Sequence, residues 1–230
     1  MRPLTDVTPK PLLAVRGRPL MAWCLHRLAQ AGVRHVVINT AWLGEHIPAA
    51  LGHQWPADAI ERPLQLHYSH EGQDFGGALE TAGGIARALP WLDAVFWVAA
   101  GDVYAPDFVF DASAPARLAA SSCLAHLWLV PNPPHHPRGD FGLSDQGLAL
   151  NLPPDHPGPR YTFSTFGLYK HTLFEPPWCD IPRGNPHGVK APLAPLLRRA
   201  MDQGRVSASL YTGAWTDVGT PERLAELNSA

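Results

Sequence analysis

Segments with helical spacing alternate with short apolar runs along the first hundred residues, and this alternation constrains the fold more than any other feature of the chain. Residues 18–32 place apolar side chains at helical spacing, and the run VRHVVIN at 33–39 follows as a strand. The pattern continues with a helix near 41–51, a strand LQLHYS at 64–69, a helix near 79–89 and a buried strand AVFWVAAGD at 94–102. Such alternation predicts an α/β fold with a parallel sheet covered by helices on both faces.

After residue 111 the pattern changes to strand-like runs separated by loops rich in proline, glycine and histidine. The runs CLAHLWLV at 123–130 and YTFSTFGLY at 161–169 are predicted strands, and a helix is predicted near 191–201. The 25 prolines lie mainly between periodic segments, where they mark loops. The chain has 230 residues, of which 46% are hydrophobic, so we expect a single domain over residues 1–230.

Charge and cysteine usage exclude several classes of partner. The formal net charge is −2 and the basic residues are dispersed, so nucleic acid is not an expected partner. Three separated cysteines, Cys24, Cys123 and Cys179, fit reduced thiols better than a disulfide framework. No run is long and apolar enough for a membrane span, and the N-terminus shows no signal-peptide pattern. We therefore expect a cytoplasmic protein without a membrane partner.

Two aspartates follow apolar runs that end at a sheet edge. Asp102 follows the predicted strand in WVAAGDVY, and Asp217 follows a short apolar run in GAWTDVGT. Open α/β sheets present ligand-binding groups at the carboxyl ends of their strands. Two carboxylates can share one Mg²⁺, which completes its shell with phosphate oxygens. The alternative is that each aspartate only caps a turn or helix.

Two further segments have the composition of a phosphate or nucleotide site. Lys10 lies between Pro9 and Pro11, and a lysine fixed on so stiff a segment suits a phosphate contact, although a solvated loop lysine is the alternative. The stretch EGQDFGGALETAGGI at 71–85 holds five glycines just before and within a predicted helix. Glycines let the backbone approach a flat or anionic ligand, but they are also ordinary in turns.

The loop PNPPHHPRGDF offers candidates for gripping a polar substrate. Vicinal His135 and His136 cannot readily bind one metal ion from a regular element, so we favour Arg138 and Asp140 as the substrate contacts. Lys190, at the predicted start of the helix KAPLAPLLRRA, is a candidate phosphate contact or a solvated lysine. The chain lacks the G-x-S-x-G, H-E-x-x-H and P-loop motifs, which leaves phosphate chemistry assisted by magnesium.

With Lys10, Asp102 and Asp217 together, the chain resembles the sugar-1-phosphate nucleotidyltransferase family over essentially its whole length. RPLT, TPKPL, LETAGGI, GDV and WTDVGT occur in the family's order. Stretches such as INTAWLGEHI, PHHPRGDF and APLLRRAM resemble the family's bacterial N-acetylmuramate α-1-phosphate uridylyltransferases, which act in peptidoglycan recycling. The resemblance implies a Rossmann-like nucleotidyltransferase fold, with a mixed, mostly parallel central sheet and helices on both faces.

The resemblance also implies an activity, a cofactor and residue roles. A sugar 1-phosphate would attack the α-phosphorus of UTP in line and release pyrophosphate. Asp102 and Asp217 would hold Mg²⁺, and Lys10 would offset charge on the transferred group. The remaining implied contacts are Glu80, Thr81 and Gly83 for the nucleotide and Asp140, Arg138 and Lys190 for the sugar. A guanylyl- or thymidylyltransferase acting on a hexose 1-phosphate is the enzymatic alternative.

Two departures from the family pattern lead to further expectations. The family's first strand, glycine-rich loop and loop arginine have no counterpart here, and Ala100 stands where the family often has asparagine beside the metal-binding aspartate. We expect a natural protein that is longer at its N-terminus, with Met1 internal to the motif. Without that strand, we expect one sheet edge to be partly exposed. The alternative is a catalytically inactive paralogue that binds a sugar nucleotide or a partner protein.

Overall fold

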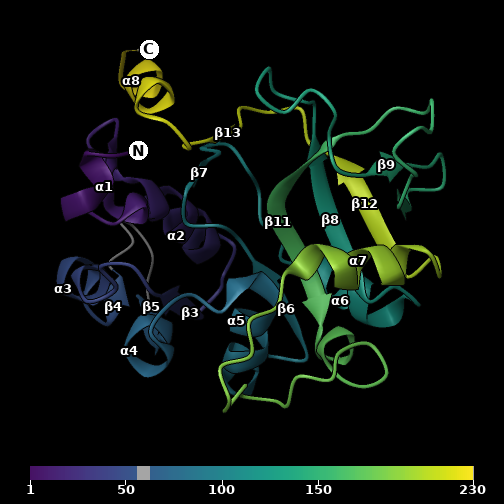
Figure 1. Ribbon diagram of the computed structural model, residues 1–230, viewed down its shortest axis with the longest axis horizontal. Coiled ribbons are helices and arrows are strands. Elements are labelled where there is room, and N and C mark those ends of the chain that lie inside the picture. Colours follow the sequence, from purple (N-terminus) through teal and green to yellow (C-terminus); the bar gives the residue numbers. More distant parts are fainter. Residues whose placement is uncertain (56–62, 230) are drawn as a thin grey trace. The chain divides into compact units, whose positions relative to one another are not determined.

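A computed structural model describes residues 1–55 and 63–229 (Figure 1). The chain divides into two compact units, which are described one at a time. Unit 1 comprises Met1–Ala78, Ala100–Ala112 and Gly213–Ala230, and unit 2 comprises Leu79–Ala99 and Ser113–Thr212. The single domain predicted for residues 1–230 stays a prediction.

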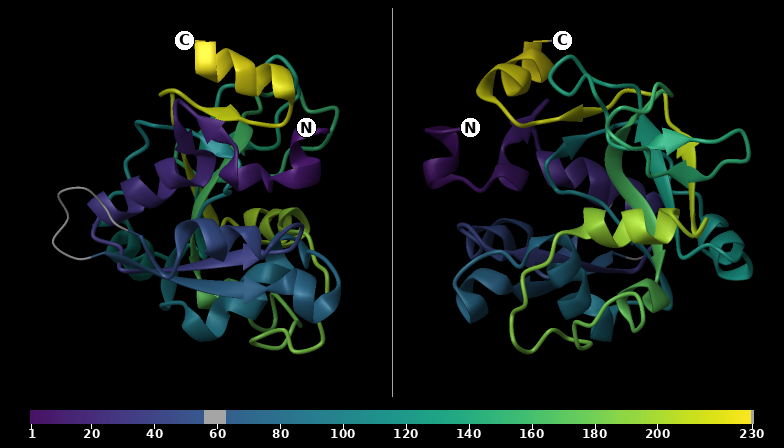
Figure 2. Two further views of the ribbon diagram at one scale, coloured as in Figure 1. Left: turned by 90° about the vertical axis from the view of Figure 1, so that its left-hand side faces the viewer. Right: turned by 45° about the vertical axis from the view of Figure 1, so that its right-hand side comes forward.

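Unit 1 is built around a small sheet in the order β3-β5-β4, with β3 and β5 parallel and side by side (Figure 2). Its strands are β1 (Ala14–Val15), β2 (Arg18–Pro19), β3 (His35–Thr40), β4 (Gln54–Trp55), β5 (Leu64–His70), β7 (Val103–Tyr104) and β13 (Thr216–Asp217). Its helices are α1 (Leu4–Val7), the 3₁₀ helix η1 (Lys10–Leu12), α2 (Leu20–Gln30), α3 (His46–Leu51), α4 (Glu71–Phe75) and α8 (Pro221–Ser229).

Helices α2 and α3 cover one face of this sheet. Leu25 of α2 and Ile47 of α3 pack with Ile38 of β3 and with the leucines of β5 in one buried cluster. Within the described residues β3 pairs only with β5, and its Val36 and Val37 are half-buried although the run reads as a fully buried strand. Among the described residues β3 is therefore an edge strand of this sheet, and the expectation that a missing strand exposes that edge stays a prediction.

Unit 2 is built around a four-stranded sheet in the order β12-β8-β11-β6 (Figure 1). Its strands are β6 (Val95–Val98), β8 (Ala125–Val130), β9 (Gly142–Leu143), β10 (Ala149–Leu150), β11 (Thr162–Lys170) and β12 (Val206–Leu210). Its helices are α5 (Glu80–Ala88), α6 (Ala114–Ala120) and α7 (Leu193–Met201), with the 3₁₀ helices η2 (Leu89–Trp91) and η3 (His171–Phe174).

Helices cover both faces of the unit 2 sheet. Residues of α5 and α7, among them Ile85 and Leu197, pack on one face with Leu127 and Tyr169 of the sheet. Helix α6 packs on the opposite face in a separate cluster of buried residues. This arrangement confirms the predicted helix layers around a sheet.

The expected mixture of parallel and antiparallel strands is confirmed, but the described sheets are not mostly parallel. Only β3–β5 and β8–β12 pair in parallel, and the other described pairs are antiparallel, because β11 runs antiparallel to both of its neighbours and the remaining pairs are short antiparallel ladders. Two predicted helices begin later than expected. Turns occupy residues 42–45 before α3, and Pro192 is the N-cap of α7, so Lys190 precedes that helix instead of starting it. None of the helices in the described ranges is long and apolar enough to cross a membrane.

Candidate functional site

The stiff segment around Lys10 brings its ammonium group to Asp102. Pro9 is extended, and Lys10 opens the 3₁₀ helix η1 with a proline at its second position. Nζ of Lys10 donates to Oδ2 of Asp102 at 2.9 Å, and both side chains are about one-third exposed, at 32% and 39%. A Cβ at Gly101 would lie 3.3 Å from the Pro11 ring, so this glycine permits the close approach of the two segments. The structure thus unites two of the predicted site residues.

A two-stranded ladder places Asp217 next to the strand that follows Asp102. In the antiparallel pair β7–β13, Asp217 lies opposite Val103, and the amide of Val218 donates to the carbonyl of Asp102 at 2.9 Å. Val218 and Tyr104 are buried in a cluster with α2 residues, at 0% and 4% exposure. Because buried neighbours fix the ladder, the backbone at both aspartates has a defined position.

Arg223 is the second cation of this ladder, and the sequence analysis missed it. Its Nη1 donates to Oδ2 of Asp217 at 2.6 Å and to the Asp217 carbonyl at 3.0 Å. A Cβ at Gly219 would overlap Nη2 of Arg223, so the glycine leaves room for the guanidinium. The only sequence signal was an arginine in the first turn of the helix after WTDVGT. We call Lys10, Asp102, Asp217 and Arg223 the ladder site.

The ladder site has donors suited to magnesium. Carboxylate oxygens are the ligands that Mg²⁺ takes from proteins, commonly one or two together with substrate phosphates. Among the residues that the structure describes, no group of three or more His, Cys, Asp or Glu side chains forms a self-sufficient metal site. Asp102 and Asp217 fit a cation that is completed by substrate oxygens, and Lys10 and Arg223 partly balance their charge in its absence.

The predicted nucleotide residues Glu80, Thr81 and Gly83 lie in the first turn of α5. Glu80 and Thr81 are exposed, and Glu80 has a left-handed φ of 58°. Gly83 is buried, and a Cβ there would overlap the carbonyl oxygen of Val189. The glycine is therefore needed for close packing of the 189–191 backbone on α5, whatever its role toward a ligand.

The segment that contains Lys190 caps the same helix end. The amides of Ala82 and Gly83 both donate to the Ala191 carbonyl, at 2.9 and 3.1 Å, and the Ala191 amide donates to Leu79. The structure thus brings exposed Lys190 to the start of α5, among the residues that we predicted for the nucleotide. The two capped amides already have acceptors, which leaves Glu80, Thr81 and Lys190 as the groups at this end that face solvent.

Asn185 holds the capping segment in place and was also missed. It is fully buried, and its side-chain amide donates to the carbonyls of Gly83 and Val189 at 3.0 and 2.9 Å. Its Oδ1 accepts from the Val189 amide at 2.8 Å. The sequence around Asn185 does not distinguish a buried asparagine that caps a segment from an asparagine exposed in a turn.

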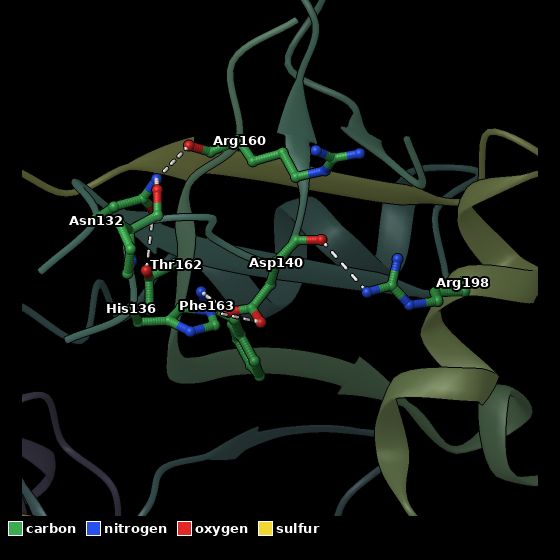
Figure 3. Close-up of polar contacts among 8 residues, drawn as sticks. Asn132, His136, Asp140, Arg160, Thr162, Phe163 and Arg198 are labelled. Carbon is green, nitrogen blue, oxygen red and sulfur yellow. Dashed lines mark hydrogen bonds and ion pairs between the residues drawn. The ribbon is translucent and has the colours of Figure 1, made fainter. Parts of the chain in front are cut away.

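Asp140, a predicted sugar contact, is engaged within unit 2 by two different partners (Figure 3). Its Oδ2 accepts from the backbone amide of Phe163 at 2.8 Å, and Nε2 of His136 lies 3.1 Å from its Oδ1. The Asp140 carbonyl accepts from Arg198 at 3.4 Å, and the Arg198 guanidinium lies over the Phe141 ring. This carboxylate therefore ties the 131–140 loop to β11.

Asn132 fixes the other end of that loop. Its Nδ2 donates to the carbonyls of Pro137 and Arg160, at 3.2 and 2.9 Å, and its Oδ1 accepts from Thr162 (Figure 3). Arg138 is exposed between these anchors. The loop consequently presents the exposed Arg138 on a backbone that is fixed at both ends.

Strand β11 carries a strained residue next to this loop. The ladder between β11 and β8 shifts register between Phe163 and Gly167, and Thr165 within the shift has φ 71°. A β-branched residue is rarely found at positive φ. Within the described residues the buried Thr165 hydroxyl has no hydrogen-bond partner. The positive φ and the unsatisfied hydroxyl make Thr165 a locally unfavourable position in β11.

The chain is similar to several nucleotidyltransferases whose descriptions name a sugar 1-phosphate. The chain is 46% identical over 227 residues to the N-acetylmuramate α-1-phosphate uridylyltransferase of Neisseria meningitidis, covering 98% of this chain and 90% of that protein. It is 29% identical over 98% of its length to the protein of the same description from Caulobacter vibrioides, of which 92% is covered. It is 26% identical to the UTP–glucose-1-phosphate uridylyltransferase of Synechocystis, of which it spans 57%.

Solved structures agree on the fold. A putative glucose-1-phosphate thymidylyltransferase from Bacillus anthracis matches with a TM-score of 0.74 at 16% identity, over 100% of this chain and 89% of that one. HddC from Yersinia pseudotuberculosis matches with a TM-score of 0.65 at 16% identity, over 96% and 89%. The chain matches no protein-family model. From the relative that shares nearly half of its residues over almost the whole chain, we conclude that this protein belongs to the sugar-1-phosphate nucleotidyltransferase family.

Proposed function

We propose that this chain joins UTP to N-acetylmuramic acid 1-phosphate, which yields the UDP-sugar and pyrophosphate. The observation that carries the proposal is the ladder site, where a lysine and two carboxylates with the residue types required for nucleotidyl transfer meet in one unit. The 46% identity to a protein described as an N-acetylmuramate α-1-phosphate uridylyltransferase favours this sugar and this base.

The chemistry requires positioning and charge balance and no covalent enzyme intermediate. A phosphate oxygen of the sugar 1-phosphate attacks the α-phosphorus of UTP, and the bond from that phosphorus to the bridging oxygen of the β-phosphate breaks. Pyrophosphate leaves with the bond's electron pair. Lys10, whose ammonium is one-third exposed beside Asp102, donates hydrogen bonds to the oxygens of the transferred phosphoryl group as negative charge shifts during the displacement.

Asp102 and Asp217 are the residues that we propose to hold Mg²⁺. Bound there, the ion would neutralise phosphate oxygens and lower the repulsion between the two anionic substrates. Arg223 keeps the Asp217 carboxylate in place through its contact at 2.6 Å with Oδ2. Lys10 does the same for Asp102 until the substrates arrive, when its ammonium turns to phosphate oxygens.

Unit 2 supplies the remaining proposed contacts. Glu80, Thr81 and Gly83, at the start of α5, are the proposed nucleotide contacts of this unit. Lys190, on the segment that caps α5, is the proposed cation for a phosphate or carboxylate. Arg138 is exposed on its anchored loop and suits the lactyl carboxylate of the sugar. Asp140 contributes by fixing that loop and by offering its partly exposed carboxylate to sugar hydroxyls. We further propose a role in the cytoplasm, in cell-wall recycling.

Pyrophosphate release is the direct test. The full chain is incubated with Mg²⁺, one nucleoside triphosphate and one sugar 1-phosphate, in a grid of UTP, GTP and dTTP against the 1-phosphates of N-acetylmuramic acid, N-acetylglucosamine and glucose. We expect the highest kcat/KM for UTP with N-acetylmuramic acid 1-phosphate, and loss of turnover when EDTA removes the metal.

Each alternative has its own outcome in that grid. A preference for GTP or dTTP with a hexose 1-phosphate contradicts the uridylyl proposal and supports the enzymatic alternative. Binding of the UDP-sugar without turnover in any cell of the grid contradicts catalysis and supports an inactive sugar-nucleotide-binding protein.

A further inference from the structure

Helix α8 is tied to the β1–β2 hairpin by the side chain of Asn228. Its Oδ1 accepts from the backbone amide of Arg16 at 2.7 Å, and its Nδ2 donates to the carbonyl of Ala14 at 3.1 Å. Nδ2 also donates to the Leu224 carbonyl of its own helix at 3.0 Å. In return, Nε of Arg16 donates to the Leu227 carbonyl at 3.3 Å. Asn228 thus bonds an acceptor and a donor two residues apart on β1, as a residue of a parallel neighbouring strand does.

The hairpin continues directly from the stiff segment that carries Lys10. The Leu13 amide donates to the Lys10 carbonyl at 3.1 Å, and the Leu13 carbonyl accepts from the amide of Leu20, just after β2, at 2.9 Å. The prolines on either side of Lys10 fix their own φ angles, so the backbone between Lys10 and Ala14 has little freedom. The position of Ala14 therefore largely sets the position of the Lys10 backbone.

The first turn of α8 contacts the other side of the ladder site. Its Arg223 donates to Oδ2 of Asp217 at 2.6 Å. Farther along the helix, Leu224 and Leu227 pack on a buried cluster of unit 1. That cluster takes one buried side chain from the hairpin and one from each strand of the β7–β13 ladder: Val15, Tyr104 and Val218. Helix α8 therefore connects the segment that carries Lys10 with Asp217, all within unit 1.

We propose that Asn228 is a positioning residue, which directs Lys10 to the transferred phosphoryl group by holding the β1–β2 hairpin on α8. The inference rests on the proposed function, because it concerns the use of Lys10 in that reaction. Asn228 acts through Lys10 and contacts neither substrate. No sequence motif assigned it to the site. Asn228 is exposed, so its replacement leaves no cavity in the core and its effect on positioning can be separated from an effect on packing.

Steady-state kinetics of Asn228→Ala test the positioning role. Lys10 is used as charge shifts in the transition state, so kcat should fall about tenfold while KM for UTP and for N-acetylmuramic acid 1-phosphate stays within about twofold. Ser229→Ala is the matched control, because Ser229 lies in the same helix turn and its hydroxyl donates to the Ala225 carbonyl of α8. The control should match the wild type. An unchanged kcat in Asn228→Ala, or a loss confined to KM, overturns the proposal.

A double-mutant cycle with Lys10→Met identifies the route of the effect. If Asn228 acts through Lys10, adding Asn228→Ala to Lys10→Met should lower kcat by less than about twofold. The same tenfold loss in both backgrounds would mean that Asn228 acts on the fold or on another group, and it would overturn the proposal. Urea denaturation completes the cycle. The midpoint of Asn228→Ala should match that of Ser229→Ala, and a large decrease would make Asn228 a residue of stability instead.

Hydrogen exchange measured by mass spectrometry tests the tether without turnover. Asn228→Ala removes the acceptor of the Arg16 amide, so exchange should be faster in residues 9–16 and unchanged in β5. Unchanged exchange in residues 9–16 overturns the proposal whatever the kinetics show. Faster exchange there, in a protein whose wild type releases no pyrophosphate, supports the tether and overturns the proposed function. Normal turnover in both the wild type and Asn228→Ala keeps the function and overturns the positioning role.

Discussion

The ladder site of unit 1 and the Asp140 cluster of unit 2 use the same kind of side chain in different ways. Asp102 and Asp217 each pair with a side-chain cation at the end of a long, partly exposed stem. Asp140 instead accepts from the backbone amide of Phe163 in a central strand. A side-chain cation can shift without disturbing the backbone, as proposed for Lys10 when a phosphate arrives, whereas a backbone amide cannot leave without disrupting its strand. An aspartate paired with a mobile side chain is therefore suited to bind a ligand or metal ion, whereas an aspartate paired with a backbone amide is suited to stabilise the fold.

The comparison predicts its largest effect for Asp102→Asn. The substitution keeps the shape and removes the charge, so turnover should fall by about 10² to 10³-fold, as for other losses of transition-state charge stabilisation. Because the Lys10–Asp102 pair is partly exposed, the free energy of unfolding should change by less than about 1 kcal/mol. Initial rates of pyrophosphate release and urea denaturation measure the two quantities.

Lys10→Met is the matched variant for the other half of the pair. It should also lower turnover without a large change in unfolding free energy. A large loss of stability with near-normal turnover in either variant would reverse the assignment and make the pair architectural.

A smaller effect is expected for Gly219→Ala, which acts through Arg223. The added methyl group would displace the guanidinium from Asp217, and losses of such supporting contacts commonly cost about 10 to 100-fold in activity or metal affinity. The measurement is kcat as a function of Mg²⁺ concentration, where the variant should need more metal for half-maximal rate.

A double-mutant cycle with Arg223→Ala checks the route of that effect. If Gly219→Ala acts by moving Arg223, the double variant should be no worse than Arg223→Ala alone. Additive losses would show that the glycine matters for the backbone of the ladder instead.

For Asp140→Ala the expected loss is in stability. Removing the acceptor of a partly buried backbone amide costs up to about 1–3 kcal/mol, and Asp140→Asn should lose less because it retains an acceptor oxygen. Urea denaturation of both variants, with KM for the sugar 1-phosphate, separates the two roles. A raised KM at unchanged stability would make Asp140 a direct sugar contact. Asp140 would then act on a ligand, as proposed for Asp102 and Asp217, and not mainly on the fold.

The sequence predicted the parts of the molecule that depend on local pattern. Prolines beside Lys10 predict a stiff segment, and an aspartate after an apolar run predicts a sheet edge, but only the family resemblance joined Lys10 and Asp102 as residues of one site before their contact was seen. Periodicity also located the longer elements such as α2, α5, β5 and β11, although α3 and α7 begin later than the pattern alone suggests.

Contacts that depend on distant backbone were not predictable. The role of Asn185 arises only after the 185–191 segment folds over α5, where an ordinary loop residue becomes fully buried between carbonyls. The strain at Thr165 arises from the register shift of β11 against β8, which requires knowledge of both strands. Pattern reasoning sees neither, because each depends on chain segments whose mutual approach is set by tertiary packing.

The comparison extends to pH through one histidine of the unit 2 sheet. Burial, with the positive charge of Arg117 as a second cause, lowers the pKa of His126 from 6.5 to about 4. Above pH 6.5 the ring is neutral in both states; as pH falls the unfolded chain takes up the proton first, so stability decreases between about pH 6.5 and 4. His126→Gln should flatten that part of the urea-denaturation profile. Ser207→Ala, which removes only the partner at 2.9 Å from Nδ1, should keep the wild-type slope. An unchanged profile in His126→Gln would assign the acid sensitivity of unit 2 to other groups.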